Sequence, residues 1–247
     1  MKEINTSGEK IDAEKTKNLN PSVNFETRDA LGRTPILLAL GARPRYGDHL
    51  FSSIHGPFNI PLIHFLVNQS PLDLRNSWYG HLPLHWACIN AAPVEVVKLL
   101  LDEFPDAAKI LGDLINLPLH LALFNGSSFE VIKLLLEVYK DAATIKGEYG
   151  RNALHFACLN QAPYNIINLL CETNNNASHE FGDLGNLPLH LACKNKASFD
   201  VIKRLLDSYP EGAIKKDDHS KLPSYYLEPL SPAILLFQDT EKTEKKE

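Results

Sequence analysis

The amino-acid sequence predicts an all-α solenoid of stacked helix-turn-helix pairs, with about five repeats and a terminal half-repeat. Three observations support this fold class: a histidine motif that recurs every 35 residues, small and apolar residues that recur in step with it, and helical patterns within each period. One unit of this size cannot bury its own apolar face, so successive units must stack on one another.

The histidine motif sets the period. It reads L-P-L-H at residues 82–85, 117–120 and 187–190, and N-A-L-H at residues 152–155. The motif histidines are His85, His120, His155 and His190. Other residue types keep the same spacing, among them Asn90, Asn125, Asn160 and Asn195, then Ala87, Ala122, Ala157 and Ala192, then Leu100, Leu135, Leu170 and Leu205. Because several positions repeat in step, the period is not a chance similarity.

The two ends of the repeat region depart from the period. One period after His190 lies Tyr225 in L-P-S-Y, where two aromatics appear and the histidine is lost, so this copy is a terminal half-repeat. The T-P-I-L of residues 34–37 lies 48 residues before the L-P-L-H of residues 82–85, so the first repeat contains an insertion of 13 residues. We expect residues 1–24 to be a disordered polar tail and residues 25–229 to be the repeat domain, with an inserted loop at 41–60. Residues 230–247 then form a C-terminal segment with a charged tail.

Each period contains two helical patterns. The first runs from Pro83 to Ile89, with the proline in the first turn, where its missing N–H costs nothing, and Asn90 ends it. The second begins after Ser128 in one repeat and after Ser198 in another, and serine is a preferred N-cap residue. The second pattern is apolar apart from one narrow polar stripe, so we expect this helix to be enclosed by its neighbours.

These features resemble the ankyrin repeat, in which a D-x-x-G turn is followed by T-P-L-H-x-A, a helix, a link and a second helix. The resemblance covers about residues 29–229. It implies a curved stack of helix pairs with turns projecting from one edge, and protein recognition through the turn tips and the concave face. It also implies that the motif histidines are structural, because in the family this histidine hydrogen-bonds backbone around the turn.

The sequence differs from the family pattern at two positions. The motif threonine is kept only at Thr34, and in three later copies its place is taken by Leu82, Leu117 and Leu187. The helix therefore lacks a capping hydroxyl, and the turn must be stabilised in another way. The turn acid is in the expected place at Asp29, but one place later at Asp113, Glu148 and Asp183.

Charge and composition argue against several classes of partner. The formal net charge is -5 and the pI is near 6.1, which disfavours binding to nucleic acid or to an anionic membrane. The chain shows no apolar secretory core in its first thirty residues and no stretch of about 20 apolar residues. We expect an intracellular protein, in the cytoplasm, with the nucleus left open.

The histidines and cysteines do not indicate a metal site or a catalytic site. Packed helices lie about 8–10 Å apart, too far for equivalent residues of adjacent repeats to share a zinc ion with bonds of about 2.0–2.3 Å. Cys88, Cys158 and Cys193 read as small buried residues, and Cys171 lies outside the pattern but is also expected to be buried. Common phosphate-binding, metalloprotease and hydrolase motifs are absent. We therefore expect no enzyme, no cofactor and no metal.

The candidate binding residues fall in two places. At the turn tips, polar residues precede each motif and we expect exposed aromatics beside them; the candidates are Trp78, Tyr79, His81, Asn116, Tyr149, Arg151 and Asn186. In the insertion they are Arg43, Arg45 and Tyr46. A solvated edge is the alternative for the first set, and a flap that caps the stack is the alternative for the loop.

A further row lies four residues after each motif histidine and consists of Ile89, Phe124, Leu159 and Lys194. It lies either on the concave face or in the packing between repeats. The sequence as a whole predicts a module or adaptor that binds another protein. The alternatives are a regulatory inhibitor that acts through the insertion loop and, more remotely, an enzyme.

Overall fold

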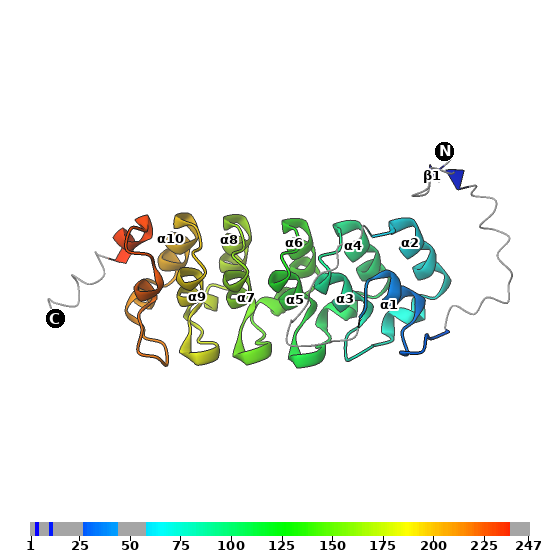
Figure 1. Ribbon diagram of the computed structural model, residues 1–247, viewed down its shortest axis with the longest axis horizontal. Helices are drawn as coiled ribbons and strands as arrows, with labels where there is room; N and C mark the ends of the chain where they lie inside the picture. Colours follow the sequence, from blue (N-terminus) through cyan, green and yellow to red (C-terminus); the bar gives the residue numbers. More distant parts are fainter. Residues whose placement is uncertain (1–2, 5–9, 12–26, 44–57, 238–247) are drawn as a thin grey trace.

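The computed structural model describes residues 3–4, 10–11, 27–43 and 58–237. Within the last two ranges the chain forms a single row of helix pairs, with the first repeat at one end and the half-repeat at the other (Figure 1). The predicted solenoid of stacked helix pairs is confirmed. The described tail residues add one feature that the sequence did not predict: strands β1 (Glu3–Ile4) and β2 (Lys10–Ile11) pair in an antiparallel sense.

Two layers of helices form the stack. The inner layer consists of α1 (Pro35–Ala39), α3 (Pro83–Ile89), α5 (Pro118–Phe124), α7 (Ala153–Leu159) and α9 (Pro188–Lys194). The outer layer consists of α2 (Ile60–Gln69), α4 (Val94–Glu103), α6 (Phe129–Val138), α8 (Tyr164–Thr173) and α10 (Phe199–Ser208). Each helix contacts its partner in the same repeat and its equivalents in the next, and the insertion lies between α1 and α2.

Short 3-10 helices form most of the connections. After the outer helices they are Pro71–Arg75, Pro105–Lys109, Lys140–Ala143, Ala177–His179 and Pro210–Ile214. In the turns before the inner helices they are Asp113–Ile115, Glu148–Gly150 and Asp183–Gly185. In the half-repeat they are Pro223–Tyr226 and Pro232–Ile234.

The inner helices are too short to be stable in isolation, since a helix needs about 12–15 residues to persist in water. They are stable here because they are enclosed, and all seven residues of α3 are buried. The predicted bounds of α3 are confirmed, and Asn90 ends the helix as expected. Its side-chain amide donates to the carbonyl of Trp86, at 3.0 Å, and to that of Leu40 in the preceding repeat, at 2.9 Å. This asparagine therefore caps one helix and joins it to another.

The motif histidine stabilises the start of its inner helix in another way. Nδ1 of His85 accepts a hydrogen bond from the backbone N–H of Leu82, at 3.2 Å, and the other motif histidines repeat this contact. The two serines that precede outer helices differ in whether they cap the helix. Ser128 accepts from the N–H of Val131, at 3.4 Å, whereas Ser198 makes no side-chain cap. The predicted starts of these helices are correct, but the capping role is confirmed for only one serine.

Candidate functional site

The motif histidines connect each repeat to the next one. With Nδ1 accepting from its own helix, Nε2 carries the proton and donates it to a carbonyl in the following turn. His85 bonds Ile110 at 3.0 Å and His120 bonds Ile145 at 3.1 Å; the remaining pairs are His155 with Asn186 and His190 with Lys221. Burial lowers the pKa of His85 to about 3 and that of His120 and of His155 to about 4. The rings are neutral at pH 7 and belong to the scaffold.

Two kinds of turn occur along the stack, and they differ at the residue eight places before the motif-histidine position, which Leu37 and Tyr225 occupy in the first and last copies. In the outermost turns this residue is an aspartate. Asp29 accepts from the N–H groups of Leu31 and Arg33, at 3.0 and 2.9 Å. Asp217 accepts in the same way from His219 and Lys221, at 2.9 Å each. These turns follow the pattern with the acid in its usual place.

Three of the turns between them have glycine at that position, namely Gly112, Gly147 and Gly182. The glycine packs against the histidine ring of the preceding repeat. A Cβ on Gly112 would lie 2.8 Å from Cδ2 of His85, and a Cβ on Gly182 would lie 3.0 Å from the same atom of His155. An aspartate would crowd the ring here. This explains why the acid of these turns appears one place later.

The four middle turns also share an unusual backbone. Their two central residues both have positive φ, as in the type I′ turn of a tight hairpin. The pairs and their angles are Tyr79 48° and Gly80 71°, Leu114 56° and Ile115 56°, Tyr149 58° and Gly150 67°, and Leu184 53° and Gly185 64°. Asparagine, aspartate or glycine normally occupies the first central position, because a bulky residue in left-handed backbone costs about 1–2 kcal/mol.

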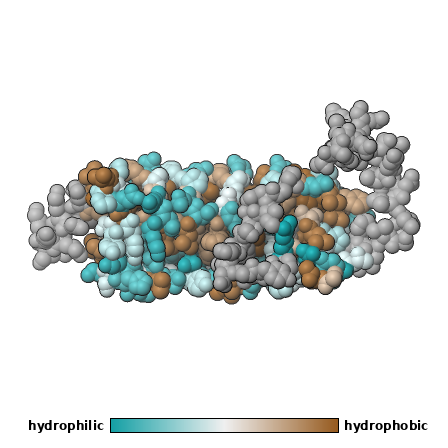
Figure 2. All heavy atoms as spheres, viewed as in Figure 1, coloured by the Kyte–Doolittle hydropathy of each residue, from teal (hydrophilic) through white to brown (hydrophobic). Residues whose placement is uncertain are grey.

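The bulky residues at the first central position are also exposed. Tyr79 is 64% exposed, Leu114 37%, Tyr149 58% and Leu184 48%. We call these four residues the tip ridge. The turns project from one edge of the stack, beside the inner helices (Figure 1), and Figure 2 shows hydrophobic residues interrupting the mostly hydrophilic surface along this edge. The ridge is thus a row of apolar side chains held out on rigid supports.

The tip ridge alternates between tyrosine and leucine, and the alternation extends into the stack. The residue after the motif histidine is aromatic at Trp86 and Phe156 but leucine at Leu121 and Leu191. The residue before the outer helix is proline at Pro93 and Pro163 but serine at Ser128 and Ser198. Alternate repeats are therefore more alike than adjacent ones, and the surface has a period of two repeats.

Four of the turn-tip candidates are buried, so their predicted place on an exposed edge is wrong. Trp78 is 7% exposed, His81 3%, Asn116 4% and Asn186 8%. Trp78 packs against Trp86 with ring centroids 5.5 Å apart, and its Nε1–H donates to the carbonyl of Leu31 at 2.7 Å. These side chains turn back into the stack, where they hold one turn against its neighbours.

The two asparagines show how this is done. Oδ1 of Asn116 accepts from the N–H of Glu148 in the next turn, at 3.1 Å. Nδ2 of Asn186 donates to the carbonyl of Asp183 in its own turn, at 2.8 Å. In both repeats the residue before the motif therefore stabilises a turn.

The other candidates lie as follows. Tyr79 and Tyr149 are exposed, and the guanidinium of Arg151 lies 4.8 Å from the ring centroid of Tyr149 while pairing with Asp183 at 3.2 Å. Arg43 is exposed, whereas Arg45 and Tyr46 lie outside the described residues. Leu114 and Leu184 were not among the candidates, although they lie 35 residues after Tyr79 and Tyr149 respectively. That spacing is the signal that could have identified them.

The row four residues after the motif histidines changes character along the stack. Ile89 is buried at 3%, Phe124 and Leu159 are half-buried against the core, and Lys194 is exposed. Packing between repeats accounts for the first three. The fourth faces solvent at the C-terminal end.

The thiols are enclosed, as the sequence indicated. Cys88, Cys158, Cys171 and Cys193 are free and buried, and burial raises the pKa of Cys193 to about 12. Over the part of the chain that the structure describes, no three metal-ligating side chains come together. Within the same ranges no helix is long and apolar enough to cross a bilayer.

The fold and the edge of turns together define a helical repeat protein of the ankyrin type. The family model described as "Ankyrin repeats (3 copies)" matches residues 52–145 and 119–219, which together span most of the chain. The chain belongs to the ankyrin repeat family, whose repeats form protein–protein interaction modules.

A solved structure has the same fold. The crystal structure of the human ASB11 ankyrin repeat domain aligns with a TM-score of 0.66 and 19% sequence identity, covering 87% of this chain and 86% of that chain. No curated protein matches the sequence. At this identity the likeness concerns the fold alone.

Proposed function

We propose that this protein is a binding module or adaptor that contacts its partner protein through the tip ridge, Tyr79, Leu114, Tyr149 and Leu184. One observation carries the proposal. Each of these residues combines an exposed apolar side chain with a left-handed backbone, at four successive turns.

Stability alone would not select these residues. Asparagine or glycine at the same positions would relieve the backbone and would remove apolar surface from water. Backbone strain that persists in a protein is concentrated at functional sites. Exposed tyrosines on a rigid support are also favourable contact residues, because they bury a large area while losing little side-chain freedom. The ridge therefore fits a recognition surface that is maintained at a cost in stability.

The test separates binding from folding. A partner is first isolated by co-purification with the tagged protein from its own cells. The four ridge residues are then changed together: Tyr79→Asn, Leu114→Asn, Tyr149→Asn and Leu184→Asn. We expect an equal or higher melting temperature and the loss of partner binding.

The matched control is Tyr164→Asn, which removes an exposed tyrosine, 47% accessible, from outer helix α8. We expect this control to bind normally. Unchanged binding by the fourfold variant would overturn the ridge assignment. A marked loss of stability in that variant would show that the ridge residues support the fold instead.

A further inference from the structure

In the terminal half-repeat the residue at the motif-histidine position is not part of the scaffold. Tyr225 occupies the position of the motif histidine but is 62% exposed, whereas the four motif histidines are fully buried. The inner helix is reduced here to the 3-10 helix Pro223–Tyr226. Pro229 accounts for the early end, because it has no N–H and disfavours helical backbone at Glu228.

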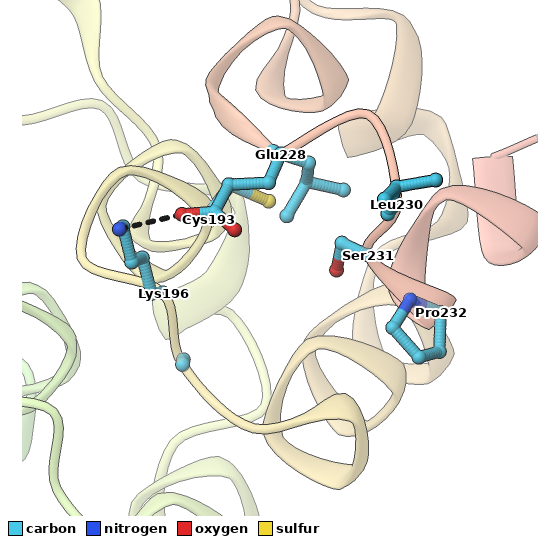
Figure 3. A pocket seen from close by; sticks show the side chains of 8 residues that line it. Cys193, Lys196, Glu228, Leu230, Ser231 and Pro232 are labelled. Atoms are coloured by element: carbon cyan, nitrogen blue, oxygen red, sulfur yellow. Dashed lines mark ion pairs between the residues drawn. The ribbon is translucent and has the colours of Figure 1, made fainter.

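The shortened helix leaves a pocket of about 280 Å³ beside the end of α9 (Figure 3). Leu227, Leu230 and Pro232 contribute apolar surface, and Leu230 is 96% exposed. The ion pair between Lys196 and Glu228, at 2.6 Å, lies at one side of the pocket. The volume is just below the range of about 300–1,000 Å³ for small-molecule sites, so it suits one large side chain.

Two lysines and two tyrosines form a cluster next to this pocket. Nζ of Lys221 lies 4.0 Å from the ring centroid of Tyr225, and Nζ of Lys194 lies 5.8 Å from that of Tyr226. The two rings meet edge to face, 5.4 Å apart. Because Lys194 is close in sequence to Lys196, and Tyr226 is next to Leu227, the cluster and the pocket adjoin.

The lysines of the cluster point to a partner of opposite charge. Among the described residues neither Lys194 nor Lys221 forms an ion pair with a carboxylate. The carboxylate that anchors the cluster is Asp217, which is 5% exposed. It accepts from the hydroxyl of Tyr226 and from two backbone N–H groups, so its hydrogen-bonding capacity is used in holding the turn and the ring in place.

We propose that this end of the protein binds an acidic segment of a partner protein that carries at least one large apolar side chain. The apolar side chain enters the pocket against Leu227 and Leu230. The flanking carboxylates contact Lys194 and Lys221, and the ring of Tyr225 covers the segment between them. Charge complementarity selects an acidic segment over a neutral one, and it makes binding weaken as salt is added.

The probe is a synthetic peptide with blocked ends and the sequence EELFEE, titrated into the full-length, nitrogen-15-labelled protein. Two matched peptides accompany it: QQLFQQ, which removes the charge, and EEAAEE, which removes the apolar side chains. We expect the largest changes in backbone amide chemical shift at Lys194, Lys221, Tyr225 and Leu230. We also expect EELFEE to bind about fivefold more tightly than QQLFQQ at low salt, from two exposed charge contacts.

Variants then locate the site. We expect the double variant Lys194→Gln, Lys221→Gln to bind EELFEE about fivefold more weakly than the unchanged protein. Most of the salt dependence of the affinity should also be lost. Leu230→Ala should weaken binding of the peptide without changing the stability of the protein, since the side chain is exposed. Lys203→Gln is the matched control, an exposed lysine on α10, and should bind normally.

Three outcomes would overturn the proposal: equal binding of QQLFQQ, shifts centred elsewhere, or shifts at these residues that depend on protein concentration without peptide, which would identify a second copy as the occupant. The fourfold ridge variant should bind EELFEE normally. Failure of this site therefore leaves the proposed ridge function untouched, and the reverse also holds.

Discussion

Gly147 lies so close to His120 that a Cβ on this glycine would be 2.6 Å from Nδ1 of the ring. The ring cannot move away, because His120 is fully buried and both of its nitrogens are hydrogen-bonded. The φ of Gly147 is -96°, which alanine accepts readily, so the cost of a side chain here is steric.

This contact predicts that Gly147→Ala lowers the free energy of unfolding by about 1–3 kcal/mol, the usual cost of overpacking. In a His120→Ala background the same change should cost less, because the ring is gone, but part of the cost remains because Oδ1 of Asn116 would also crowd the same Cβ. Urea unfolding of the four proteins of this cycle measures the coupling. Additive effects of the two changes would contradict the close contact.

The neutral motif histidines predict a marked loss of stability in mild acid. Their folded pKa values, about 3 for His85 and about 4 for His120 and His155, lie below the ordinary value of 6.5. Between these values the unfolded chain binds protons that the native protein does not. The free energy of unfolding therefore falls as the pH falls from 6.5, with a slope of about 4 kcal/mol per pH unit near pH 5.

The measurement is the urea concentration at the midpoint of unfolding, at pH 7, 6 and 5. This window lies above the ordinary pKa of the carboxyl groups, so histidines dominate it. A His120→Asn variant should show about a third less slope. A constant midpoint from pH 7 to 5 would contradict the buried, neutral assignment.

The enclosed thiols predict resistance to modification. We expect no rapid reaction of the native protein with a disulfide reagent such as DTNB at pH 8, because the thiolate is the reactive form and burial disfavours it. Full reaction should follow in denaturant. Cys171→Ala should leave the native time course unchanged. A fast phase that this change removes would show that Cys171 is accessible.

Substitutions at Trp78 and at Tyr79 should differ in their effect on stability. Trp78→Phe removes the hydrogen bond to the carbonyl of Leu31 and should cost about 1 kcal/mol of stability. Tyr79→Phe should be neutral, since the side chain is 64% exposed. Urea unfolding of both variants checks this. Equal effects would contradict the assignment of one side chain to the core and the other to the surface.

Sequence periodicity located the helices well because each element repeats with its flanking residues. Pro83 begins a helix and Asn90 ends one for local reasons, and the same signals recur in every copy. Exposure at the turns was harder to predict, because it depends on which kind of turn forms. Glycine at Gly112 or Gly147 allows a tight turn pressed against a histidine, and this contact is between repeats.

The kind of turn explains why some residues that were predicted to be exposed are buried. Trp78 looked like a contact residue because large aromatics are common at interfaces, but the tight turn directs it into the stack. Leu114 and Leu184 were not predicted as contact residues, because single exposed leucines are common on protein surfaces. Their left-handed backbone, which sets them apart, is visible only in the structure.

The tyrosine–leucine alternation along the tips has a consequence for how many partners can be held. A partner that contacts two adjacent tips meets the same pair at Tyr79 and Leu114 as at Tyr149 and Leu184, about 20 Å further along. If the tip ridge binds its partner as proposed, two copies of a short partner can then occupy one protein. A longer partner that covers all four tips fits in one register only. A partner whose chain contains two copies of the short binding segment binds more tightly than one with a single copy, because the second copy binds within the same complex.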